Sequence, residues 1–344
     1  MHPIMQLPIN EDIRRNRGYA SVLSAAFKAV SKNFKTVFRR LWPFALAYAV
    51  VAAFILVSGV HNSRIDVVAT FEQPDAAYWI VFIGTLLLMF ATSIALIGRT
   101  AMLMNGGGMR VNMLRSWSLH IFGIAVFIVI MACIAIAYTI IYNVQLNAVE
   151  DETSAYATGM MADTAPVMDV TPYVLASSLI AIIAGLLLLP YLYVGTKYLM
   201  APVDGNERKR NRLPRLVFKA YGQGIRHWGY IFITVLLLGI IVAAVQFIVS
   251  IPMSILVVAL GLAVSGTLSG DELGLPGYFY PMMYIVSVAT YFILTAATVY
   301  SMFVMSYMYG SIETRIEEKR SLKEKAKDKD GAKQRAVWDK TEYV

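Results

Sequence analysis

The chain has 344 residues, of which 58% are hydrophobic and only 15% are charged, whereas soluble domains carry about 25% charged residues. With a mean hydropathy of +0.60, this composition excludes two ordinary soluble domains and indicates one all-α, polytopic integral membrane domain. The net charge of +8 comes from basic residues that flank apolar stretches, so we expect the partner to be anionic lipid headgroups and not nucleic acid.

Residues 1–18 form a polar N-terminal segment, and residues 19–41 are predicted to form an amphipathic, basic helix. Its apolar residues recur at steps of three and four, which places them on one face: Tyr19, Val22, Leu23, Ala26, Phe27, Val30, Phe34, Val37, Phe38 and Leu41. A helix of this kind tends to lie in the headgroup plane of a membrane. It leads through Trp42 and Pro43 into the first hydrophobic span.

Six uncharged stretches are long enough to cross a bilayer, and we place them roughly at Leu41–Val60, Tyr78–Ile97, Leu119–Tyr142, Tyr173–Gly195, Gly229–Val249 and Met282–Tyr309. A further apolar run, residues 253–264, follows Pro252. This run predicts either an extension of the fifth helix or a short interfacial helix, with a bend near Pro252.

All but one of the 30 lysine and arginine residues lie before the first span, after the sixth, or in the second-to-third and fourth-to-fifth connections. The exception is Arg64 in the first connection. Because cytoplasmic loops collect lysine and arginine, we expect both termini in the cytoplasm and the protein in the inner membrane. The charged C-terminal segment, residues 311–344, is predicted to be helical and then mobile from Leu322 onward.

A short basic segment precedes each odd-numbered span and ends at a tryptophan: residues 19–41 before Trp42, 111–117 at Trp117, and 213–227 before Trp228. We interpret the chain as three helix-hairpin repeats, each with a cytoplasmic interfacial helix, a span, an outer loop and a second span. The alternative is that basic, tryptophan-flanked entrances occur in any membrane protein of this orientation.

One local pattern is similar to a known family. Val22-Leu23-Ser24-Ala25-Ala26-Phe27-Lys28, followed by Lys32-Asn33-Phe34 and a span, resembles the membrane domain that accompanies some bacterial glycerophosphodiester phosphodiesterases, and related stand-alone six-span proteins. The resemblance covers most of the chain and implies an architecture. It implies no catalytic residue, because no soluble stretch is long enough for the catalytic barrel of those enzymes.

The fourth-to-fifth connection carries a basic cluster with six members: Arg208, Lys209, Arg210, Arg212, Arg215 and Lys219. Each lysine or arginine near an anionic leaflet contributes on the order of 1 kcal/mol of binding free energy. The cluster therefore predicts a contact with anionic headgroups or with a partner protein, or it serves only to set the orientation.

Two features interrupt the uncharged spans. Pro190 lies inside the fourth span, where it kinks the helix and frees a carbonyl, and it indicates a packing bend or a substrate site. Gln246 is the one strongly polar side chain near the middle of a span, which predicts an interhelical hydrogen bond or part of a polar cavity wall.

No catalytic, cofactor or metal site is expected. No pair of the four histidines has metal-ligand spacing, and Gly106-Gly107-Gly108 lacks the lysine of a phosphate loop. The sequence therefore favours a non-enzymatic inner-membrane protein that organises or assists a membrane complex or an envelope process. The alternative is a transporter or lipid-handling protein with a cavity between the repeats, near Pro190 and Gln246.

Overall fold

The computed structural model describes residues 13–68, 76–156, 171–201, 213–268 and 275–341, and within these ranges the chain is helical and has no strand. Six helices are long and apolar enough to cross a membrane, which confirms the predicted fold class. The helices are α2 (Tyr19–Lys32), α3 (Phe34–Val68), α4 (Ala76–Asn105), α5 (Met109–Tyr156), α6 (Thr171–Met200), α7 (Leu213–Arg226), α8 (Trp228–Leu268) and α9 (Phe279–Thr341).

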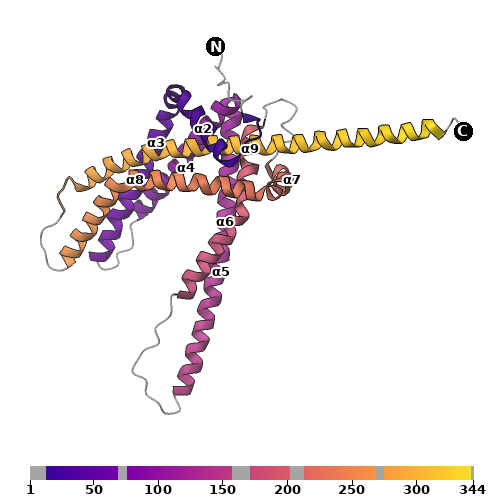
Figure 1. Ribbon diagram of the computed structural model, residues 1–344. Helices are drawn as coiled ribbons and strands as arrows, with labels where there is room; N and C mark the ends of the chain where they lie inside the picture. The colour runs from indigo at the N-terminus through magenta and orange to yellow at the C-terminus, as the bar shows by residue number, and fades with distance from the viewer. Residues whose placement is uncertain (1–12, 69–75, 157–170, 202–212, 269–274, 342–344) are drawn as a thin grey trace.

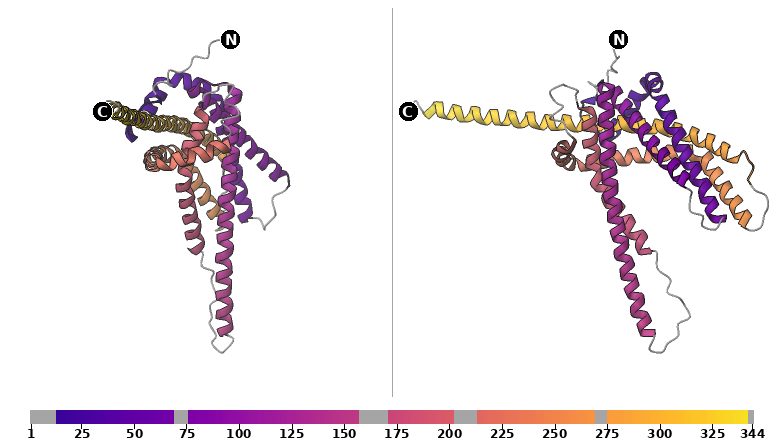
Figure 2. Two further views of the ribbon diagram at one scale, coloured as in Figure 1. Left: turned by 90° about the vertical axis from the view of Figure 1, so that its right-hand side faces the viewer. Right: turned by 180° about the vertical axis from the view of Figure 1, so that it is seen from behind.

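The six long helices form three contacting pairs, α3 with α4, α5 with α6, and α8 with α9, and α9 also lies along α3. They make two arms that diverge from one end of the molecule (Figure 1). One arm holds α5 and α6, and the other holds α3, α4 and the neighbouring parts of α8 and α9, as Figure 2 shows from two further directions. The last part of α9 projects away from both arms.

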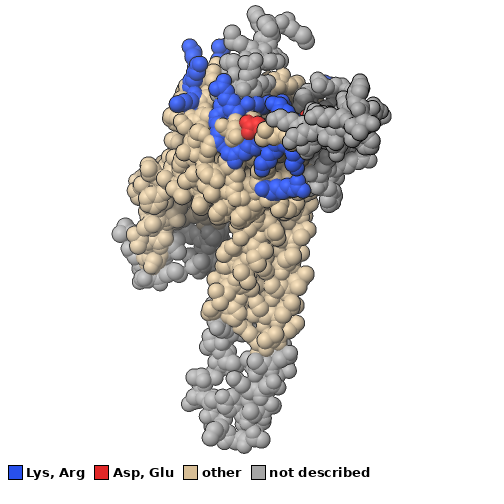
Figure 3. All heavy atoms as spheres, turned by 45° about the vertical axis from the view of Figure 1, so that its right-hand side comes forward, with Lys and Arg blue, Asp and Glu red and all other residues tan. Residues whose placement is uncertain are grey.

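The described lysine and arginine side chains gather at the end where the arms meet, whereas the arms are covered by uncharged residues (Figure 3). The most deeply buried large side chains come from several helices and include Met104, Tyr193, Ile231, Phe303 and Tyr307. The arms instead expose large apolar side chains, as expected for helices whose solvent is lipid. The core therefore lies near the junction, and α9 runs through it.

The N-terminal surface helix is shorter than predicted, because α2 ends at Lys32 and α3 begins at Phe34. Asn33 makes the break: its side-chain amide donates to the carbonyl of Ala29 at 2.9 Å, while its own carbonyl accepts from the backbone N–H of Val37 at 2.9 Å. An asparagine side chain can compete in this way with the helix ladder. The predicted single helix over residues 19–41 is therefore wrong beyond residue 32.

The apolar stripe of α2 is divided between two environments. Val22, Leu23 and Ala26 are buried, and α2 packs against α9 and α8. Phe27, on the same predicted face, is 63% exposed. Part of the stripe thus serves protein packing, and only the remainder is free to contact a membrane surface.

The segment 111–117 is not a separate helix, which corrects the second predicted surface helix. It forms the first turns of α5, a continuous helix of 48 residues, because the chain has neither glycine nor proline between Met109 and Phe122. The third, α7, is a separate helix and ends at Arg226. There the backbone N–H of His227 donates to the carbonyl of Gly224. The carbonyl of His227 in turn accepts from the N–H of Ile231 at the start of α8.

The fifth and sixth spanning helices are both longer than predicted. Of the two alternatives after Pro252, the structure shows the extension, since α8 continues as helix to Leu268. Helix α9 continues past Leu322 and ends at Thr341 after 63 residues, and the mobility expected from Leu322 onward stays a prediction. Between Leu322 and Thr341 lysine is the commonest residue, alanine recurs, and no proline interrupts the helix.

Candidate functional site

The basic cluster predicted between the fourth and fifth spans lies mostly outside the described residues, which begin again at residue 213. Arg208, Lys209, Arg210 and Arg212 fall in the gap. Arg215 and Lys219 belong to α7, but their side chains are not among those described. The lipid or partner contact of this cluster stays a prediction.

Pro190 and Gln246 are not brought together. Pro190 is buried in α6, whereas the side chain of Gln246 is exposed on α8. Within the described part of the chain Gln246 makes no side-chain hydrogen bond, so the interhelical bond expected of it is not formed there. A shared polar site at these two residues is absent from the described structure.

Pro190 anchors α7 and the start of α8. Proline has no backbone N–H, so the carbonyl of Leu186, four residues earlier, loses its helical donor. The indole N–H of Trp228 donates to that carbonyl at 3.2 Å, and the hydroxyl of Tyr221 donates to the next one, Leu187, at 2.7 Å. Of the two interpretations of Pro190, these contacts favour the packing bend.

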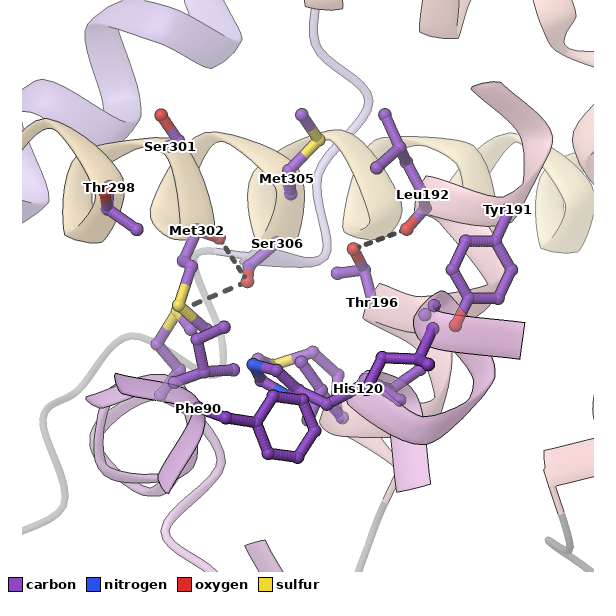
Figure 4. Close-up of a pocket in the computed structure, with 18 of the residues that line it drawn as sticks. Phe90, His120, Tyr191, Leu192, Thr196, Thr298, Ser301, Met302, Met305 and Ser306 are labelled. Carbon is purple, nitrogen blue, oxygen red and sulfur yellow. Dashed lines mark hydrogen bonds between the residues drawn. The ribbon is translucent and has the colours of Figure 1, made fainter. Parts of the chain in front are cut away.

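A cavity of about 610 Å³ opens between α4, α5, α6 and α9. Figure 4 shows Met302 and Ser306 of α9 on one side, Phe90 and His120 on the other, and Thr196 of α6 between them. Small-molecule sites range over roughly 300–1,000 Å³, so the volume suits one ligand. The neighbours of Pro190 in sequence line this cavity, but neither Pro190 nor Gln246 does.

The serine and threonine hydroxyl groups in the cavity wall have already used their protons, whereas the buried hydroxyl of Tyr191, which also lines the cavity, has no hydrogen-bond partner among the described residues. Thr196 donates to the carbonyl of Leu192 at 2.7 Å, and Ser301 donates to that of Ala297 at 2.8 Å. The hydroxyl of Ser306 has a carbonyl and a thioether sulfur as partners. These groups have little left to offer a polar ligand, because each hydroxyl has only one proton to donate.

Both ring nitrogens of His120 also have partners. Nδ1 lies 2.8 Å from the carbonyl oxygen of Ser116, which can only accept, so Nδ1 carries the proton. Nε2 then accepts from the hydroxyl of Ser93 at 3.0 Å. The ring of Phe90 packs edge-on against the imidazole. His120 is therefore a structural wall residue.

Four methionines complete the wall: Met104, Met200, Met302 and Met305. The thioether side chain is flexible and polarizable, so it adapts to ligands of varied shape. No aspartate, glutamate, lysine or arginine lines the cavity. The arrangement can hold an uncharged hydrocarbon group.

A polar cluster closes one end of the cavity. The amide of Asn105 donates to the carbonyl of Leu199 at 2.8 Å and to the side chain of Asn112 at 2.7 Å. Arg115 is only 8% exposed and donates to the carbonyl of Ala201 at 2.6 Å. A cation at the C-terminal end of a helix is favourable. These contacts tie the ends of α4 and α6 to the start of α5.

An ion pair links α6 to α9 beside this cluster. Lys197 Nζ lies 2.6 Å from Glu313 Oε1, and the hydroxyl of Tyr193 donates to the same carboxylate oxygen at 2.6 Å. The side-chain amide oxygen of Gln223, on α7, accepts from Lys197 at 3.3 Å. Sequence reasoning missed this network, because Lys197 and Glu313 are 116 residues apart.

His227, at the junction of α7 and α8, is influenced by α9. Burial lowers the pKa of its imidazole below the ordinary value of 6.5, and the positive charges of Lys319 and Arg315 lower the pKa further. The imidazole is therefore neutral at pH 7, which fits a packing residue at a helix junction.

Comparison with known proteins finds no matching family model, no matching curated protein and no matching solved structure. The resemblance to the membrane domain that accompanies glycerophosphodiester phosphodiesterases therefore stays a prediction.

Proposed function

We propose that this is a non-enzymatic, multi-pass protein of the inner membrane that handles lipid by holding a hydrocarbon chain in the cavity between its two arms. The observation that carries the proposal is an open cavity of about 610 Å³ with a neutral, methionine-rich wall. This cavity favours the alternative function predicted from the sequence, a transporter or lipid-handling protein. The first, organising a membrane complex, stays a prediction.

The chemistry of the wall supports a hydrocarbon over a polar solute. A polar solute loses its hydrogen bonds to water on entering, and such a loss costs roughly 1–3 kcal/mol for each group left unpaired. The hydroxyls of Thr196 and Ser301 donate to carbonyls of α6 and α9 and cannot replace these hydrogen bonds, which leaves the unpaired hydroxyl of Tyr191 as a single group that could bind a polar atom. An acyl chain has no hydrogen-bonding groups, so it loses no hydrogen bonds on entering the cavity.

The affinity for a chain that is already in the bilayer comes from packing. Lipid tails are as apolar as leucine, so their transfer into the cavity gains almost no hydrophobic free energy. Binding then depends on how well the flexible side chains of Met302 and Met305 close around the chain. We expect modest affinity, with selectivity for chain length and shape.

Filling the cavity tests the proposal. Gly123 lines it, and a Cβ built at Gly123 meets nothing within 4 Å, so Gly123→Phe adds a ring at the cavity wall from a position where the Cβ has room. We expect a photoreactive acyl-chain lipid to label residues 119–127 and 298–306 of the wild type, and to label them at least about tenfold less in the variant, a loss of about 1.4 kcal/mol.

The matched control is Gly239→Phe on α8, where a Cβ also meets nothing within 4 Å and which does not line the cavity. It should label like the wild type. Equal labelling in Gly123→Phe and Gly239→Phe, or no wild-type labelling at these segments, would contradict lipid binding in the cavity.

The orientation is part of the proposal: both termini lie in the cytoplasm. Its support is the collection of lysine and arginine where the arms meet (Figure 3), because positive residues are retained on the cytoplasmic side. In a Cys133→Ala background, a membrane-impermeant thiol reagent applied to intact spheroplasts should label Glu150→Cys and leave Val344→Cys unlabelled until lysis. Labelling of both variants before lysis would overturn the orientation.

A further inference from the structure

We infer a second binding site, for the phosphate group of an anionic phospholipid, at the pair of arginines beside Phe44 where α3 and α4 meet. It is separate from the cavity. Ile97 and Met104 line the cavity, whereas Arg99 follows Ile97 by two residues and therefore points about 200° around α4 from it. The inference does not depend on the proposed acyl-chain site.

The guanidinium group of Arg99 contacts an aromatic ring but has no carboxylate partner among the described residues. Its guanidinium carbon lies 5.1 Å from the centre of the Phe44 ring, and its Nε is buried with no hydrogen-bond partner. The nearest acceptor to Nη1 is the sulfur of Met102, at 3.9 Å. Among the described residues no carboxylate pairs with Arg99. Most of its five N–H donors are therefore unused.

Arg40 adds a second cation at the same place. It precedes Phe44 by four residues in α3, so the two side chains lie on one face, a single turn apart. Arg40 is partly buried and also has no carboxylate partner among the described residues. Arg99 thus contacts the Phe44 ring, and Arg40 lies one turn away on the same face of α3, with no carboxylate paired to either among the described residues.

Phosphate is the anion that fits this arrangement. The planar fork of arginine matches the oxygens of a phosphate group, and hydrogen bonds between ions are about twice as strong as neutral ones. Both residues belong to helices long and apolar enough to span a membrane. Arg40 lies in the first two turns of α3, and Arg99 lies in the last two turns of α4. A phosphate held at that depth belongs to a lipid headgroup more readily than to a soluble molecule.

The test measures how phosphatidylglycerol raises the thermal stability of the purified full-length protein in neutral detergent, with phosphatidylcholine and inorganic phosphate as separate arms. We expect the wild type to respond to phosphatidylglycerol at concentrations where the other two have no effect. Arg99→Gln should need on the order of tenfold more phosphatidylglycerol for the same shift, and Arg40→Gln should weaken binding in the same direction. Arg99→Lys should bind phosphatidylglycerol more tightly than Arg99→Gln but less tightly than the wild type.

The matched control is Lys28→Gln, which removes the same charge from an exposed position on α2. It should respond like the wild type. If Arg99→Gln and Arg40→Gln also respond to phosphatidylglycerol like the wild type, the proposed phosphate site at these two arginines is wrong. If Arg99→Gln alone fails to fold, Arg40→Gln decides the result. An arginine-dependent shift with inorganic phosphate alone would overturn the assignment to lipid.

Discussion

Replacing Gly224 with alanine is expected to separate α7 from α6 and to lower the free energy of unfolding by about 2 kcal/mol or more. A Cβ at Gly224 would lie 2.9 Å from the Cβ of Pro190, 3.1 Å from its carbonyl oxygen and 3.2 Å from its Cα. These atoms belong to a ring and a backbone, so they cannot rotate away. Overpacking of this kind typically costs 1–3 kcal/mol.

The displacement would also weaken two hydrogen bonds. Tyr221 and Trp228 reach the carbonyls of Leu187 and Leu186 only while α7 lies against α6, and each bond contributes about 1 kcal/mol of stability. The measurement is unfolding of the purified protein in mixed micelles of dodecyl maltoside and dodecyl sulfate.

Gly222→Ala is the matched control for this prediction. Gly222 lies in the same helix, and a Cβ there meets nothing within 4 Å. Alanine favours helix over glycine by up to about 1 kcal/mol, so this variant should be slightly more stable than the wild type. A stabilising effect of both substitutions would show that the close approach of α6 and α7 does not hold in the folded protein.

The second large effect is expected at the ion pair between α6 and α9. Lys197→Met leaves the carboxylate of Glu313 with the Tyr193 hydroxyl as its remaining partner. The two side chains are 25% and 17% exposed, between a surface pair, which contributes at most about 1 kcal/mol, and a buried one, whose disruption costs about 3–5 kcal/mol. We expect Lys197→Met to lower the free energy of unfolding by roughly 1–3 kcal/mol.

The double variant separates the ion pair from the packing of the side chains. Lys197→Met with Glu313→Leu removes both charges, and well-packed apolar pairs often replace buried ion pairs at little cost. It should therefore be more stable than Lys197→Met alone. Additive losses in the double variant would mean that the two residues act independently, despite the 2.6 Å distance between Nζ and Oε1.

The six spanning helices could be predicted from sequence because hydropathy is a local property of long segments. The ends of the surface helices could not be predicted in this way. The helix is interrupted at Asn33 by a side-chain hydrogen bond, and no glycine or proline marks the position. Tryptophan is a poor indicator of a helix end for a related reason: Trp117 lies inside α5, while Trp228 begins α8.

The contacts around the candidate sites depend on residues far apart in the chain. The kink at Pro190 and its freed carbonyl were predictable from one residue, but the donor, Trp228, lies 42 residues from Leu186. Arg115 was predicted only as one positive charge among many. Its role in capping α6 depends on a carbonyl 86 residues away, which no local pattern indicates.

Helix α5 is longer than a bilayer core is thick. Its 48 residues extend for about 72 Å at 1.5 Å per residue, more than twice the ~30 Å hydrocarbon core of a bilayer. The turns after Tyr142 account for about 20 Å of this length. A force applied at the C-terminal tip of α5 would act through a lever whose fixed end is the start of α5, where Arg115 donates to carbonyls at the end of α6.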